Sequence, residues 1–122
     1  MGPEAKLYRK LKVETPEIIW NRVENLSIPG MPDVLGYNTF GTFFTVELKV
    51  AKSNKVKFSP HQIAFHKSHP ENTFILLKTH GQCVLKLVPG SEIHDLRTLG
   101  HDKIFTTATS WEGIQTTFEN IF

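Results

Sequence analysis

The stretch GMPDVLGYNTFGTFFTVELKV, residues 30–50, contains two short apolar runs joined by an Asn-Thr-Phe-Gly turn sequence. β-Branched and aromatic residues are frequent in both runs, which predicts two strands. Strand side chains alternate between two faces, so Glu47 and Lys49 point the same way. Burying a charge without a partner is costly, so this face is expected to meet solvent or a metal ion. The opposite face is expected to fill the core through Phe44, Val46, Leu48 and Val50.

Length and composition bound the class of protein. The chain has 122 residues, which suits a single domain over 1–122, and 39% hydrophobic residues, enough for a core. It has no apolar run of about 18 residues and no apolar N-terminal signal core, so we expect a cytoplasmic protein with no membrane partner. One cysteine, Cys83, excludes an internal disulfide and a cysteine-based zinc site, and it is expected to be a small core residue.

The remaining segments predict a mixed α/β domain of order α-β-β-β-α-β-β-α. Ser59, Pro60 and Gln62 form a capping-box start for one of the helices. Helices are expected over 4–12, 59–69 and the tail 110–122, with a short additional helix over 91–96. Strands are expected over 17–25, 33–37, 43–50, 72–79 and 83–88.

The net charge of +2 is small, but the basic residues are clustered. One group begins near the end of the second strand of the opening stretch and continues beyond it, and the other lies near the N-terminus. Such groups can contact a phosphate backbone or form an ordinary solvated surface, and charge alone leaves both interpretations open. The two groups are Lys49, Lys52, Lys55 and Lys57, and Lys6, Arg9, Lys10 and Lys12.

Two carboxylates are expected to meet in the opening stretch. Asp33 begins the first strand, and a hairpin would bring it beside Glu47. Two carboxylates at one sheet edge are hard-oxygen ligands of the kind that Mg²⁺ prefers. Phosphodiester hydrolysis needs this set, because Mg²⁺ polarises the phosphoryl oxygen and a nearby lysine such as Lys49 stabilises developing charge.

Pro32-Asp33 followed by Glu47-Leu48-Lys49 resembles the PD-(D/E)xK nuclease superfamily. Over residues 18–80 the longer pattern resembles small Holliday-junction-resolvase-like and VRR-NUC-type nucleases of phages. The resemblance implies a restriction-endonuclease-like α/β fold, a mixed sheet flanked by helices. It also implies Asp33 and Glu47 as metal ligands, the Leu48 carbonyl as a further ligand, and Lys49 as the catalytic lysine.

The resemblance extends to residues outside the central motif. Gln62 takes the place of a glutamine near the scissile phosphate, although it can equally be only the capping partner of Ser59. One more upstream acid is implied, for which Glu24 is preferred to Glu4 and Glu14. Arg22, on the same strand face as Glu24, and the lysines at 52, 55 and 57 are assigned to nucleic-acid contact.

The function implied is a Mg²⁺-dependent, structure-selective DNA endonuclease, with Mn²⁺ expected to substitute. Branched DNA, above all a four-way junction in a phage context, is the expected substrate, cut by a homodimer without a small-molecule cofactor in the host cytoplasm. Paired cuts require two active sites, which a two-fold dimer supplies. The alternatives are a less selective nicking, repair or restriction-type nuclease, and an inactive nucleic-acid-binding module.

Two further groups of residues have competing interpretations. Tyr37, Phe40 and Phe43 can stack on bases, but core packing is expected for most of them. His61, His66 and His69 have helical spacing, yet they lack the cysteine or carboxylate partner that a zinc site needs. A zinc site is therefore not expected.

Overall fold

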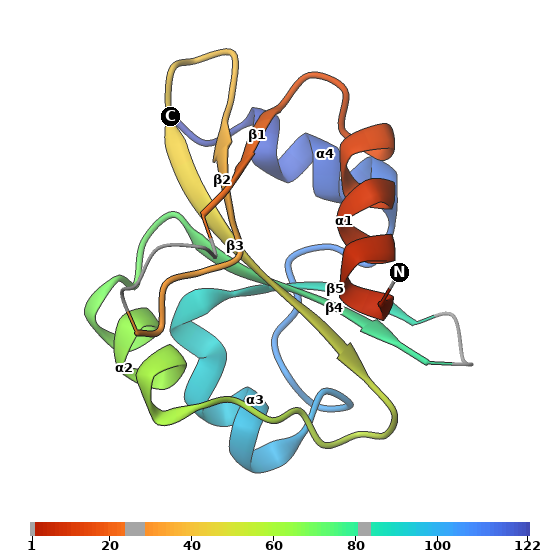
Figure 1. Cartoon of the computed structure of the whole chain (residues 1–122), viewed down its shortest axis with the longest axis vertical. Helices are drawn as coiled ribbons and strands as arrows, with labels where there is room; N and C mark the ends of the chain where they lie inside the picture. Colours follow the sequence, from red (N-terminus) through yellow and green to blue (C-terminus); the bar gives the residue numbers. More distant parts are fainter. Residues whose placement is uncertain (1, 24–28, 81–83) are drawn as a thin grey trace.

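The computed structural model of the chain describes residues 2–23, 29–80 and 84–122. One five-stranded sheet has the strand order β1-β2-β3-β4-β5 (Figure 1). β3 and β4 run parallel, whereas the other neighbours are antiparallel. The strands are β1 (Ile19–Arg22), β2 (Val34–Tyr37), β3 (Phe43–Ala51), β4 (Thr73–Thr79) and β5 (Leu85–Pro89).

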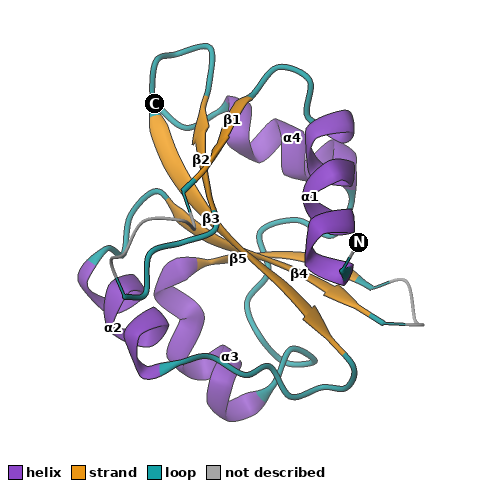
Figure 2. Cartoon of the chain, in the orientation of Figure 1, coloured by secondary structure: helices purple, strands orange, loops and turns teal. Residues whose placement is uncertain are grey.

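Helices cover both faces of the sheet (Figure 2). The parallel pair β3–β4 needs a crossover connection, and α2 lies within it. α1 and α4 pack on one face, and α2 and α3 lie on the other. The helices are α1 (Pro3–Glu14), α2 (Pro60–Ser68), the 3₁₀ helix η1 (Gly90–Glu92), α3 (Ile93–Leu99) and α4 (Trp111–Glu119).

The predicted order α-β-β-β-α-β-β-α is confirmed, and the short additional helix expected between the last strand and the last helix is also present. The short helix expected over 91–96 is η1 followed directly by α3, which continues to Leu99. The capping box at Ser59 is present, because Ser59 Oγ accepts from the Gln62 amide and Gln62 Oε1 accepts from the Ser59 amide. Cys83 and the last residues of the strand expected over 17–25 lie outside the described residues. Within the described part of the chain, no helix is long and apolar enough to cross a membrane.

Two apolar clusters hold the sheet between its helices. Beneath α1 and α4, Phe44 stacks on Phe118 with ring centres 4.6 Å apart, and Val46 and Leu48 are buried beside them, as the sequence predicts. The cluster on the other face includes Ile75, Leu77, Val88, Ile93 and Leu96. The alternation of β3 therefore places apolar side chains under α4 and the Glu47 side chain on the side of α2.

The prediction that Phe40 and Phe43 pack in the core is wrong. Each has 57% of its surface exposed. Phe40 lies in the β2–β3 turn, and Phe43 starts β3 on the face away from α1 and α4. The Phe40 ring lies beside Phe122 and the Phe43 ring beside Tyr37, so these aromatic contacts are made at the surface and do not lead to burial.

Candidate active site

The site lies where β2 stops pairing with β3. β2 pairs only with Phe43–Val46, in the register Val34 opposite Val46. The second half of β3 therefore has an edge with no β2 neighbour, and Asp33, just before Val34, lies beside it. Asp33 Oδ2 accepts a hydrogen bond from the Leu48 amide at 2.7 Å. The Asp33 carboxylate thus accepts a hydrogen bond from a β3 amide that no β2 residue pairs with. Asp33 and Glu47 lie next to each other, as the predicted hairpin requires.

Glu47 is a buried carboxyl group with an unusual environment. Only 2% of its surface is exposed, and among the described residues its Oε1 has no hydrogen-bond partner. The pKa of Glu47 is raised to about 9, first of all by burial, then by the hydrogen bond and the charge of Asp33, and also by the charge of Glu4. The nearby Lys49 ammonium opposes this shift. In this environment the Glu47 carboxyl group therefore holds a proton far more readily than a negative charge.

A divalent cation fits this pair of carboxyl groups. It would replace the proton on Glu47 and give the buried Oε1 of Glu47 the partner that it lacks among the described residues. The N–H and C=O of one strand residue point to the same side, so the Leu48 carbonyl also faces the Asp33 edge. No three His, Cys, Asp or Glu side chains gather as a metal site in the described ranges. Mg²⁺ suits two carboxylates because it commonly keeps several of its waters.

Lys49 extends toward the start of α2. Its Nζ lies 3.3 Å from Gln62 Oε1, and 4.9 Å from the centre of the Phe58 ring. Gln62 is therefore both the capping partner of Ser59 and a neighbour of Lys49, so the two roles considered for it are compatible. Phe58 was missed by the sequence reasoning, and its position directly before the Ser59-Pro60 helix start is the signal that could have found it.

The three upstream acids differ in where they lie. Glu4, in the first turn of α1, is close enough to influence the Glu47 pKa and lines a pocket with Lys49. Glu14, at the other end of α1, pairs with Lys10 at 3.1 Å. A helix rises about 1.5 Å per residue, so these two carboxylates are about 15 Å apart along the axis. Glu24, the preferred acid from sequence, lies outside the described residues.

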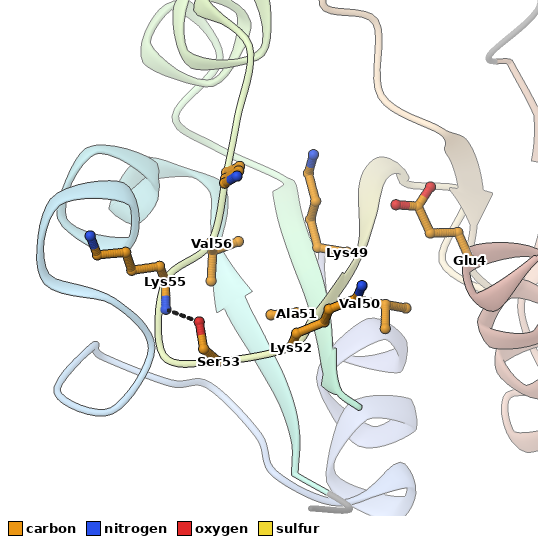
Figure 3. A pocket seen from close by; sticks show the side chains of 9 residues that line it. Glu4, Lys49, Val50, Ala51, Lys52, Ser53, Lys55 and Val56 are labelled. Atoms are coloured by element: carbon orange, nitrogen blue, oxygen red, sulfur yellow. Dashed lines mark hydrogen bonds between the residues drawn. The ribbon is translucent and has the colours of Figure 1, made fainter. Parts of the chain in front are cut away.

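A pocket of about 500 Å³ opens beside Lys49 (Figure 3). Its walls are the end of β3, the segment that follows, and Glu4, whose carboxylate reaches in from α1. The basic residues predicted to contact nucleic acid therefore share one pocket with the catalytic lysine candidate, except Arg22. The Arg22 guanidinium lies 4.8 Å from the Tyr8 ring centre, on the side of α1. The lining residues are Glu4, Lys49, Val50, Ala51, Lys52, Ser53, Lys55, Val56 and Lys57.

The mixed sheet with helices on both faces is a restriction-endonuclease-like α/β fold. Among solved structures, the chain is similar to Hjc, a Holliday junction resolvase from the archaeal hyperthermophile Archaeoglobus fulgidus, with a TM-score of 0.54. The two are 20% identical, and the similarity covers 70% of this chain and 76% of that chain. At this identity the similarity establishes the fold. No protein-family model matches the chain. No curated protein matches it either.

Proposed function

We propose that this protein is a Mg²⁺-dependent endonuclease that hydrolyses phosphodiester bonds in branched DNA, with the four-way junction as its main substrate. The observation that carries the proposal is the buried Glu47 carboxyl, with an unpartnered Oε1, beside Asp33 and Lys49. A buried carboxyl group without a partner lowers the stability of a fold, so its presence suggests a function. Binding a cation is the function that fits this group. The shared fold with a junction resolvase supports the choice of DNA as substrate.

The residues of the site have separate roles in this proposal. Asp33 and Glu47 would hold Mg²⁺ together with the Leu48 carbonyl, and the Leu48 amide keeps Asp33 oriented. When bound, Mg²⁺ polarises the phosphoryl oxygen and lowers the pKa of a coordinated water. Lys49 stabilises the negative charge that builds on the phosphoryl oxygens, and Gln62 holds the Lys49 ammonium in place.

We further propose Glu4 as the upstream acid, in place of Glu24. Its support is the shared pocket with Lys49 and its electrostatic effect on Glu47. A carboxylate at this position can orient a water between α1 and the end of β3. Glu4→Gln is expected to slow cleavage, whereas Glu14→Gln, at the far end of the same helix, is the matched control and should cleave normally.

Substrate contact would come from the lysines that line the pocket. Lys52, Lys55 and Lys57 can neutralise phosphates on both sides of the scissile bond. Phosphate contacts read backbone shape and carry no sequence information, which suits a junction enzyme. Resolution needs two symmetric cuts, so we propose a homodimer as the active form, acting on replicating phage DNA in the host cytoplasm.

The direct test is cleavage of labelled four-way junction, linear duplex and single strand in the presence of Mg²⁺. Paired nicks in the junction, at a rate well above that for duplex, are expected. Equal cutting of all three substrates would reject junction selectivity and leave a less selective nuclease. Tight junction binding without cleavage in either Mg²⁺ or Mn²⁺ would instead indicate an inactive binding module.

The metal can be tested without cleavage. A ligand that binds only the folded state raises its stability, by about 2.7 kcal/mol at a hundredfold excess over Kd. Mg²⁺ should therefore raise the Tm of the wild type and leave that of Glu47→Gln unchanged. An equal Mg²⁺ effect on both proteins would place the metal elsewhere.

A further inference from the structure

The Lys49 ammonium is held by uncharged groups. Its neighbours are the Phe58 ring, 4.9 Å from Nζ to the ring centre, and Gln62 Oε1 at 3.3 Å. The Lys10–Glu14 ion pair and the His101–Asp102 contact, found within the described ranges, do not include Lys49. The positive charge is thus positioned without a direct carboxylate partner, although Glu47 lies nearby.

This arrangement suits a lysine that must act on a phosphate. A lysine side chain carries about 2 kcal/mol of rotamer entropy, so without a fixed contact the ammonium would sample many positions. A carboxylate would fix it but would also cancel its charge. A ring face attracts a cation by about 0.5–2 kcal/mol and adds no formal charge, so position is gained while the charge stays available.

Phe58 is itself firmly placed. Its half-buried ring packs against the apolar cluster between the sheet and α3, which includes Ala51, Val56 and Ile75. The next residue, Ser59, is the N-cap of α2, and its capping box holds Gln62 at the same time. The two groups that contact Lys49 therefore belong to one capped segment at the start of α2.

We propose that Phe58 is a positioning residue for Lys49, which it holds through the face of its ring. The inference rests on the proposed role of Lys49 in cleavage, and Phe58 touches neither metal nor substrate in this account. The role depends on the π face and not on bulk alone. Phe58→Tyr should therefore preserve it, whereas Phe58→Leu, which is apolar but has no ring, should remove it.

The kinetic test compares these variants on a four-way junction with Mg²⁺. We expect Phe58→Leu to lower kcat by about 3- to 30-fold with KM within about twofold, and Phe58→Tyr to keep most of the rate. Ile63→Ala is the matched control, because Ile63 packs on the same cluster, whereas the Lys49 ammonium lies against Gln62 and Phe58. A Phe58→Leu protein that keeps the full kcat would overturn the inference. So would an equal loss of rate in Ile63→Ala.

A double-mutant cycle separates positioning from general support of the site. In a Lys49→Ala background, Phe58→Leu should cause no further loss of rate, since there is no ammonium left to position. The same fractional loss in both backgrounds would show that Phe58 acts on something other than Lys49.

A spectroscopic readout keeps the inference distinct from the proposed function. Protons above a ring face are shifted upfield, so the Lys49 ε-methylene protons should be upfield in the NMR spectrum of the wild type and Phe58→Tyr, and shift back in Phe58→Leu. If the wild type cleaves no DNA, the proposed nuclease function fails on its own assay. Absence of the upfield shift in the wild type would overturn the ring contact, whatever the activity.

Discussion

Leu48 and Glu47 are adjacent in β3 and equally buried, each with 2% of its surface exposed, yet they lie on faces with opposite chemistry. Leu48 packs with Phe44 and Val46 beneath α1 and α4, and its burial stabilises the fold. Glu47 is buried toward α2 with a raised pKa and an oxygen that has no partner among the described residues. One strand thus carries an apolar face that stabilises the domain and, on its other face, a buried carboxyl group that lowers stability.

The difference explains why the two faces should respond differently to substitution. Apolar contacts on the Leu48 face are maintained by close packing, where loss of volume is costly. On the Glu47 face the charges and their geometry decide the outcome, because a neutral group of the same shape packs as well as the carboxyl. Activity and stability should therefore separate by face.

The largest effect is expected from neutralising the carboxyl pair. Asp33→Asn and Glu47→Gln should lower the cleavage rate by more than about 10⁴-fold, or about 5 kcal/mol of transition-state stabilisation. Junction affinity, measured by gel shift in Ca²⁺, should stay near the wild-type value, since the proposed phosphate contacts come from lysines. If either variant cuts at close to the wild-type rate in Mg²⁺, the two residues are not the metal ligands.

The opposite face is tested by Phe44→Ala, which should cost about 3–5 kcal/mol of unfolding free energy. Phe44 is buried and in contact with Phe118, Trp20 and Phe74, so the cavity cannot readily close. Urea unfolding gives the loss, and the cleavage rate per folded molecule should be unchanged. A Glu47→Gln protein that is destabilised as much as Phe44→Ala would remove the contrast between the faces.

A smaller effect is expected from the basic segment beyond β3. Changing Lys52, Lys55 and Lys57 to Gln should weaken junction and duplex binding together, and each lost phosphate contact should flatten the slope of log affinity against log salt by about 0.9. Cleavage by the bound fraction should persist. The matched variant changes Lys6, Arg9 and Lys12 to Gln. If this variant flattens the salt slope and the variant of Lys52, Lys55 and Lys57 does not, the DNA-facing surface lies at α1.

The smallest effect concerns the helix that covers the Glu47 face. His66 is the fully buried residue of α2, whereas α4 buries the apolar Ile114 and Phe118. The Nδ1 of His66 donates a hydrogen bond to the Gln62 carbonyl at 2.9 Å. Burial lowers the pKa of His66 from 6.5. The unfolded chain therefore binds this proton more readily, and stability is lost as the pH falls from 6.5 toward the lower pKa of the folded state.

Urea unfolding as a function of pH measures this dependence. The loss should not exceed about 1.4 kcal/mol per pH unit, the limit for one proton. His66→Leu should remove the His66 contribution, whereas His61→Gln, an exposed histidine on the same helix, should keep the wild-type slope. Equal slopes in the wild type and His66→Leu would show that another group is responsible.

Local features of the sequence were enough to predict most of the elements and the centre of the site. The two-residue period of β3 separates Glu47 and Lys49 from the apolar face, and the short hairpin brings Asp33 next to Glu47. The start of α2 follows from Ser59 and Gln62, because a capping box is made by residues three apart. Each of these outcomes depends on residues that are close in the chain or joined by one turn.

The tertiary structure alone decided what approaches this centre. It set the depth of Glu47 through the helices that cover the sheet, and it left Phe40 and Phe43 exposed despite their apolar side chains. Sequence reasoning preferred Glu24, which lies outside the described residues, because it shares a strand face with Arg22 just before the Asp33 turn. That Glu4 reaches the pocket depends on the packing of α1 on the sheet. The angle and register at which a helix docks depend on the complementary shape of both surfaces, and no local pattern encodes that fit.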